Sequence, residues 1–121
     1  MDNTKISDAG LKHLRKLANL PSLYLDNTQI KNVPLKHFGG LTGLIDLSLS
    51  GTKVGDEGLK TLGRLPNLQH LSLQGTQVSD DGMKHLTNSS NLESLWLNKT
   101  QVTNAGVKML QESLPNCIIS H

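Results

Sequence analysis

Aromatic side chains are nearly absent from this 121-residue sequence, which contains one Tyr, one Phe and one Trp. Aromatic packing therefore cannot build the core, and the abundant leucines must fill it. The single cysteine, Cys117, excludes an intrachain disulfide and a cysteine-rich metal site. The 12 basic and 10 acidic residues give a formal charge of +2. That balance is too even to indicate a nucleic-acid or membrane-binding surface.

Long apolar runs and catalytic motifs are also missing. No stretch of about 18 apolar residues occurs, so the sequence predicts neither a transmembrane helix nor a signal peptide, and the compartment stays open. A nucleophile elbow, a phosphate-binding G-x-x-x-x-G-K loop and an H-E-x-x-H motif are all lacking. His13, His37 and His85 recur in one column without carboxylates to complete a metal site. We therefore expect no enzyme, cofactor or bound metal.

One motif recurs at a strict interval of 24 residues, which is typical of a solenoid. Threonine marks each copy, at Thr4, Thr28, Thr52, Thr76 and Thr100. Upstream of four of them stands L-x-x-L-x-L, for example Leu68, Leu71 and Leu73. The alternation at its end predicts a strand with leucine facing inward. Strands that repeat in one direction must pair in parallel, about 4.8 Å apart.

The second half of each repeat has helical spacing. Leu11, Leu14 and Leu17 lie three residues apart and form a stripe that can face the strand leucines. An Asp or Asn column precedes each helix, and its side chains are predicted to be N-caps: Asp8, Asn32, Asp56, Asp80 and Asn104. Lysine follows four residues later in every copy, at Lys12, Lys36, Lys60, Lys84 and Lys108. Pairing with the column aspartates is the expected role of these lysines, and an anion-binding ridge is the alternative.

The pattern predicts one domain, residues 1–121, of about five coils: 4–27, 28–51, 52–75, 76–99 and 100–121. Pro34 is compatible with a first helical turn. Ser89 replaces a column leucine, so we expect a shorter helix and looser packing in the fourth coil. Residues 114–119 predict a short edge strand that closes the array. The first coil lacks a preceding strand motif and a polar N-terminal cap, which suggests a fragment of a longer array.

The motif L-x-x-L-x-L-x-x-T-x-V/I-x-D/N-x-G-L-K-x-L resembles the leucine-rich repeat family over essentially the whole chain. It looks like the bacterial type abundant in planctomycetes, with Asn-Thr or Gly-Thr after the strand and a final Leu-Pro-x-Cys-x-Ile. It is also similar to the cysteine-containing repeats of F-box proteins, with threonine in place of cysteine. The resemblance implies a right-handed α/β solenoid with a parallel β-sheet on its concave face, short helices on its convex face, a protein-binding role and no catalytic residues.

Threonine at the end of each strand predicts an inward-facing ladder formed by Thr28, Thr52, Thr76 and Thr100. The chain turns there, and buried backbone groups at the turn need partners that a hydroxyl can supply. Cys117 precedes the last strand. We expect it to be half-buried in the core, with a reactive thiol or an interchain disulfide as the alternative.

Side chains between the strand leucines should point out of the concave face. Tyr24, Ser48, Ser72 and Trp96 form the central column, and Tyr and Trp are frequent interface anchors. The predicted partner-binding patch comprises Tyr24, Asp26, Asp46, Ser48, His70, Ser72, Gln74, Ser94, Trp96 and Asn98. Alternatively, Trp96 merely covers the exposed side of the last full strand.

Three functions are compatible with this patch and with the uncapped end. The first is a non-enzymatic protein-protein interaction module that binds a protein partner through the concave sheet. The second is an assembly element that forms a homo-oligomer through its exposed first coil. The third and weaker alternative is carbohydrate binding by Tyr24 and Trp96, with Asp46, Gln74 and Asn98 as hydrogen-bonding groups.

Overall fold

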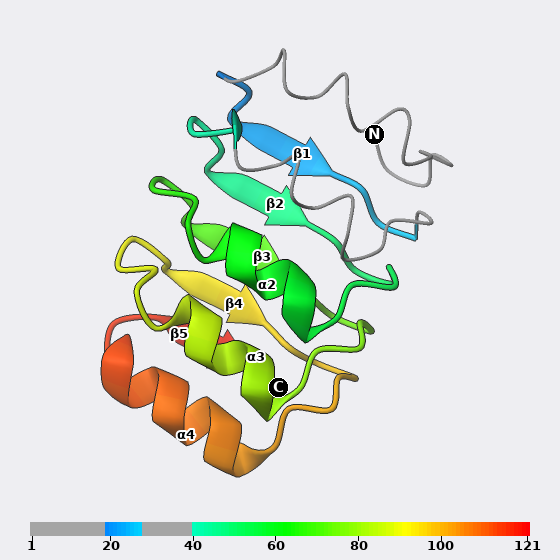
Figure 1. The fold of residues 1–121 in the computed structure, drawn as a ribbon, viewed down its shortest axis with the longest axis vertical. Helices are drawn as coiled ribbons and strands as arrows, with labels where there is room; N and C mark the ends of the chain where they lie inside the picture. The colour runs from blue at the N-terminus through cyan, green and yellow to red at the C-terminus, as the bar shows by residue number, and fades with distance from the viewer. Residues whose placement is uncertain (1–18, 28–39) are drawn as a thin grey trace.

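The computed structural model describes residues 19–27 and 40–121. Within them, five short strands form one parallel sheet in chain order (Figure 1). The strands are β1 (Ser22–Tyr24), β2 (Asp46–Ser48), β3 (His70–Ser72), β4 (Ser94–Trp96) and β5 (Ile118–Ser120). The expected closing edge strand is therefore present as β5, which pairs with β4. Expectations for Thr28, Pro34 and the first helix lie outside the described residues.

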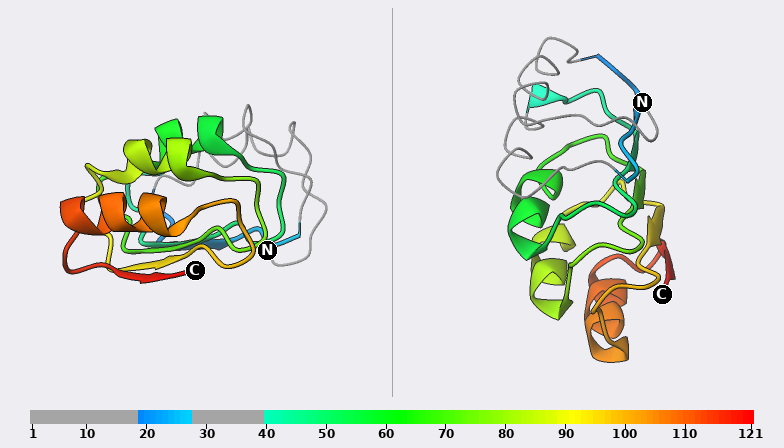
Figure 2. Two further views of the ribbon diagram at one scale, coloured as in Figure 1. Left: turned by 90° about the horizontal axis from the view of Figure 1, so that it is seen from below. Right: turned by 90° about the vertical axis from the view of Figure 1, so that its right-hand side faces the viewer.

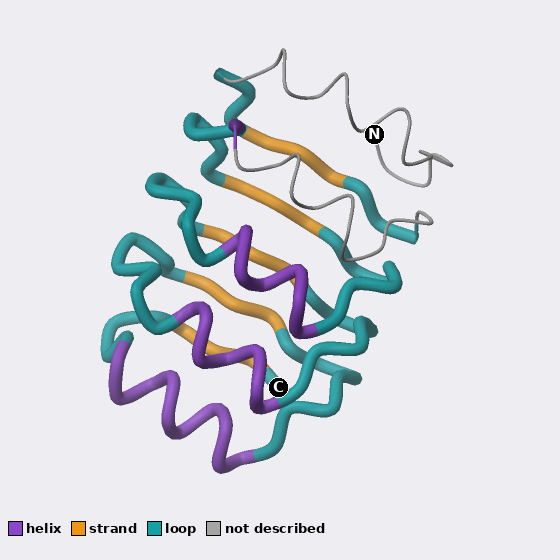
Figure 3. Tube along the Cα trace, viewed as in Figure 1, coloured by secondary structure: helices purple, strands orange, loops and turns teal. Residues whose placement is uncertain are grey.

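Helices connect the later strands and lie together on one side of the sheet (Figures 2 and 3). They are α2 (Asp56–Leu62), α3 (Asp80–Met83), the 3-10 helix η3 (Lys84–Leu86) and α4 (Asn104–Ser113). The described residues form an α/β solenoid, as the repeat predicts, with the parallel sheet on one face and the helices on the other. The fourth coil has a shorter α-helix, four residues in α3 against seven in α2, but η3 continues it directly for three more residues, so the helical segment as a whole is not shorter.

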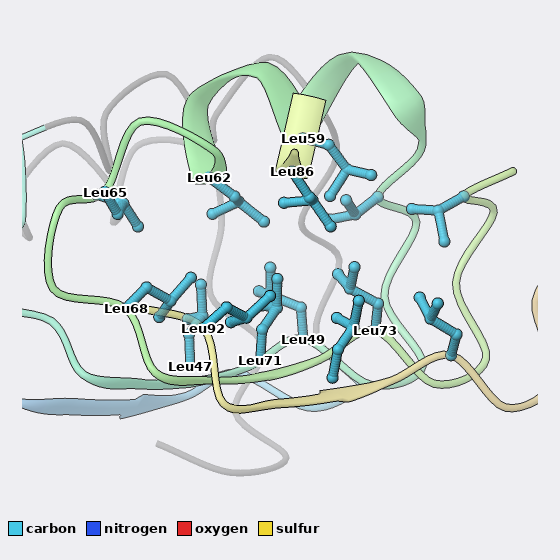
Figure 4. Close-up of a cluster of buried hydrophobic side chains, with 14 of the residues drawn as sticks. Leu47, Leu49, Leu59, Leu62, Leu65, Leu68, Leu71, Leu73, Leu86 and Leu92 are labelled. Carbon is cyan, nitrogen blue, oxygen red and sulfur yellow. The ribbon is translucent and has the colours of Figure 1, made fainter. Parts of the chain in front are cut away.

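Leucines from the strands and from α2 and η3 meet between the sheet and the helices (Figure 4). Leu47, Leu71 and Leu95 lie in register on adjacent strands and are at most 2% exposed. Leu59 and Leu86 face them from the helical side and are fully buried. The 24-residue period thus places equivalent leucines on top of one another, which produces one continuous core along the stack.

In the described residues the helices begin at Asp56, Asp80 and Asn104, but these residues are not the N-caps, and that prediction is wrong for them. The N-cap residues are Gly55, Ser79 and Thr103, each one position earlier than expected. The Asp56 carboxylate instead reaches the next coil, where it accepts the backbone N–H of Ser79 at 2.7 Å and the Ser79 hydroxyl at 2.5 Å. Asp80 does the same with Thr103, at 2.8 and 2.5 Å. These carboxylates therefore join neighbouring coils.

This contact also explains why glycine stands two residues after the column aspartate or asparagine in the next coil, at Gly82 and Gly106. A Cβ atom on Gly82 would lie 2.4 Å from Asp56 Oδ1, and one on Gly106 would lie 2.1 Å from Asp80 Oδ1. Real Cβ contacts are not that short, so only glycine leaves room for the carboxylate of the preceding coil. The predicted pairing of Lys60 with Asp56 is accordingly wrong, and Lys60 Nζ lies 3.1 Å from Glu57 Oε1 instead.

The contact with Thr103 perturbs the acidity of Asp80. The Thr103 hydroxyl, and then its backbone N–H, lower the pKa of this carboxyl, and a weaker effect of burial opposes them. Because the folded-state pKa is depressed, the stabilisation is present above the unfolded-state pKa and is lost as pH falls through the folded-state pKa. Thr103→Val should raise the pKa of Asp80 toward its ordinary value, measured by NMR of the carboxyl carbon during an acid titration. Thr103→Ser is the control and should preserve the shift; an unchanged pKa in the valine variant would contradict the account.

The turns after the strands require a left-handed backbone. The φ angles at four equivalent positions are 59° at Asn27, 72° at Gly51, 71° at Gly75 and 60° at Lys99. A lysine is strained in this region, whereas glycine is not. Lys99→Gly should therefore raise the free energy of unfolding by about 0.5–1 kcal/mol, measured by urea denaturation. Lys53→Gly is the control: Lys53 has no positive φ, so its replacement should lower stability. Equal effects at the two positions would contradict this explanation.

Threonine hydroxyls close the same turns. Thr52 and Thr76 are 3% and 5% exposed. Their Oγ1 atoms donate to the carbonyl oxygens of Leu49 and Leu73 at 2.7 and 2.6 Å, and Thr100 donates to that of Leu97 at 2.6 Å. Each bond runs three residues back within its own coil. The hydroxyls therefore bond to the carbonyl of the leucine that follows each of β2, β3 and β4, and they do not link one coil to the next.

Candidate binding surface

The outward side chains of the sheet lie in continuous columns. In the central column Tyr24 lies opposite Ser48, Ser48 opposite Ser72, and Ser72 opposite Trp96. The neighbouring column runs through Ser22, Asp46, His70, Ser94 and Ile118. Ile118 is 71% exposed and is absent from the predicted patch. Ile118 lies 24 residues after Ser94. The repeat period therefore places it in this column, although the sequence around it lacks the L-x-x-L-x-L motif.

A depression of about 510 Å³ lies over these columns, and its two ends carry the aromatic residues. Its lining consists of Tyr24, Asp26, Asp46, Leu47, Ser48, His70, Ser72, Gln74 and Trp96. The structure therefore brings together eight of the ten residues predicted to form the patch. Ser94 and Asn98 are partly exposed but do not line the depression. Tyr24 and Trp96 are 43% and 38% exposed, and three strand spacings separate them by about 14 Å.

Hydrogen bonds order the floor of this depression. The Asp26 carboxylate accepts the Ser48 hydroxyl and, at 3.1 Å, the backbone N–H of Ser50. The Ser50 and Ser72 hydroxyls lie 2.6 Å apart and form the next link. The chain of bonds crosses three coils and fixes side chains that would otherwise rotate freely. A partner would consequently meet a surface that loses little conformational entropy on binding.

Two carboxylates determine the charge of the depression. Asp26 has no cationic partner in the described part of the chain, and Asp46 accepts the Ser22 hydroxyl at 3.0 Å. His70 Nε2 lies 3.8 Å from Asp46 Oδ1 and is charged only when protonated. The lining contains no lysine or arginine. The surface is therefore negative while His70 is neutral, although the whole chain carries a formal charge of +2.

Cys117 lies away from this surface, in the core before β5. It is 4% exposed, so it is more buried than the sequence predicts, and burial raises the pKa of its thiol. A raised pKa lowers the population of the reactive thiolate. In residues 19–27 and 40–121, no group of three or more His, Cys, Asp or Glu side chains is placed to hold a metal ion. The same residues contain no helix that is both long and apolar enough to span a membrane.

Comparison with known proteins identifies the family. Residues 18–78 match the model described as leucine rich repeat, and the chain belongs to that family. A leucine-rich repeat protein of Leptospira interrogans superposes with a TM-score of 0.77 at 27% identity, over 91% of this chain and 27% of that chain. An internalin of Listeria monocytogenes superposes with a TM-score of 0.58 at 18% identity, over 90% of this chain and 36% of that chain. The chain thus spans about a third or less of either structure. No curated protein sequence matches it.

Proposed function

We propose that this chain is a non-enzymatic recognition module that binds a protein partner through the sheet face. Leucine-rich repeat proteins generally act in protein-protein interaction. The observation that carries the proposal is the depression over β1 to β4, with an aromatic residue at each end and a hydrogen-bonded serine floor. Because the chain spans only part of either solved structure, we also propose that it is one segment of a longer bacterial array.

The lining indicates the chemistry of the partner. Tyr24 and Trp96 expose large ring surfaces that a partner can bury at low entropic cost. Between them, Asp26 and Asp46 supply negative charge that no lysine or arginine of the lining neutralises. A partner segment with lysine or arginine near an apolar or aromatic side chain would complement both features. We therefore propose a basic, partly apolar protein surface as the occupant.

A displayed library of random peptides tests this proposal without knowledge of the natural partner. Selection on the wild-type chain should enrich peptides that carry lysine or arginine. Asp46→Asn should weaken their binding about fivefold, measured by calorimetry, because it removes one exposed opposite charge. Asp81→Asn is the matched control: this exposed carboxylate lies on α3, on the opposite side, and its replacement should leave affinity unchanged. Equal losses in the two variants would contradict recognition at the sheet face.

Self-association and carbohydrate binding remain alternatives. Self-association depends on the first coil, of which residues 4–18 lie outside the described residues. Analytical ultracentrifugation over a concentration series would show a strict monomer if that alternative is wrong. Binding to a glycan array would be expected only if the two aromatic residues act as sugar platforms.

A further inference from the structure

A second depression lies on the helix side of the solenoid, away from the sheet face. It has a volume of about 450 Å³ and lies where α2 ends beside η3, two elements that pack against each other. Its lining consists of Lys60, Gly63, Arg64, Lys84, His85 and Asn88. Three of these side chains are permanently cationic, and none is a carboxylate. We name this depression the basic groove.

The repeat explains why the cations gather there. Lys60 and Lys84 occupy the same column of successive coils, so stacking α2 on the next helical segment places them side by side. The aspartates expected to neutralise this column face elsewhere, because Asp56 and Asp80 accept hydrogen bonds from Ser79 and Thr103. The two lysines are thereby left without the aspartate four residues earlier that helical spacing suggests.

The remaining carboxylates neutralise little of the groove. Glu57 pairs with Lys60 at 3.1 Å, but both side chains are more than half exposed, and such pairs contribute little. Within the described ranges, neither Arg64 nor Lys84 forms an ion pair. The groove therefore carries net positive charge between two coils, from Arg64 and Lys84 above all.

Carbonyl groups at the ends of α2 and η3 already accept hydrogen bonds from groups other than these cations. Lysine and arginine often bond to the last carbonyls of a helix. Here the carbonyls of Leu59 and Thr61 accept the backbone N–H groups of Gly63 and Arg64, at 2.9 and 3.1 Å. The carbonyl of Lys84 accepts the Thr87 hydroxyl at 2.9 Å. The cationic side chains consequently remain available to an external anion.

We propose that the basic groove binds a phosphate-bearing polyanion. The guanidinium of Arg64 can donate two parallel hydrogen bonds to phosphate oxygens, and the two lysines add point charges on either side. His85 lies within the same lining, half-buried, and would add a further charge when protonated. This site lies on the opposite face from the proposed protein-binding surface, so either proposal can fail without the other.

Titration with inorganic tripolyphosphate, followed by amide NMR shifts, tests the proposal. Shifts should concentrate at Gly63, Arg64 and the η3 segment. Arg64→Gln and Lys84→Gln should each weaken binding about two- to fivefold, as expected for one exposed ionic contact, and the double variant should weaken it further. Lys53→Gln removes the same charge from a different exposed position and should have no effect. Circular dichroism would verify that each variant is folded.

A second arm distinguishes the source of the phosphate. Co-sedimentation with phosphatidylcholine vesicles, with and without phosphatidylserine, would indicate a lipid headgroup if binding requires phosphatidylserine and is lost in the double variant. Tripolyphosphate binding without co-sedimentation would indicate a soluble or protein-borne phosphate. Scattered shifts, no shifts, or an equal loss in Lys53→Gln would overturn the proposal, because net charge alone would then explain any binding.

Discussion

Replacing Leu71 with alanine should lower the free energy of unfolding by about 3–5 kcal/mol. Leu71 is fully buried on β3, the middle strand, and lies in register between Leu47 and Leu95. The strands on both sides are held by parallel backbone pairing, so the coils cannot shift to fill the cavity. The loss of unfolding free energy should therefore include most of the energy needed to leave a cavity, in addition to the energy of the lost apolar burial.

Urea denaturation would measure this loss. Leu114→Ala is a suitable control, because Leu114 is 6% exposed and lies near the end of the array, where fewer neighbouring coils surround it. Its loss should be clearly smaller. Since small domains are stable by only about 5–15 kcal/mol, the Leu71 variant should lose at least about a fifth of the free energy of unfolding. A loss below about 1 kcal/mol would mean that the coils repack and that the continuous core is not what stabilises the stack.

The second large effect concerns binding. With a peptide selected on the wild-type chain, Trp96→Ala should weaken affinity about 30- to 1,000-fold, the range expected for an aromatic interface anchor. Stability should change little, because the side chain is already 38% exposed and lies outside the leucine core. Tyr24→Ala should behave similarly at the other end of the depression. Titration calorimetry gives the affinity, and thermal unfolding gives the stability of the same samples.

Ile118 provides the control for this experiment. It is an exposed apolar residue on the same sheet face, but it does not line the depression. Ile118→Ala should change the affinity less than about fivefold. The alternative role of Trp96, as a cover for the last full strand, predicts the reverse result: a large loss of unfolding free energy in Trp96→Ala with peptide binding retained.

The stacking of coils could be predicted from the leucines and threonines because these residues repeat without insertions. Once Leu47, Leu71 and Leu95 are taken as equivalent, the register of Ser48, Ser72 and their neighbours follows, and the structure shows that same register. Periodicity is informative here because each coil makes the same contacts with the next. The position of the depression could be predicted for the same reason.

Contacts between coils are harder to predict, because N-cap preferences and i,i+4 pairing describe only residues within one helix. Asp is a favoured residue type for an N-cap, which is why Asp56 is predicted to be one. In the structure its carboxylate instead accepts the backbone N–H and the hydroxyl of Ser79 in the next coil. The glycine at Gly82 is the signal that could have revealed this, since a glycine in the column one coil later leaves space for the carboxylate. The sequence offers an anion-binding ridge only as the alternative role of the lysines, because helical spacing favours their pairing with aspartates that in fact face another coil.

Mapping amide chemical-shift changes on the unmodified chain, with a selected peptide, tests the proposed function most directly. The largest changes should fall on Ser48, Ser72 and Trp96, and the indole N–H of the single tryptophan should shift with them. Gly63 and Asn88 in the basic groove should remain unaffected. Changes concentrated on the helix side, with the sheet-face resonances unmoved, would contradict recognition through the sheet.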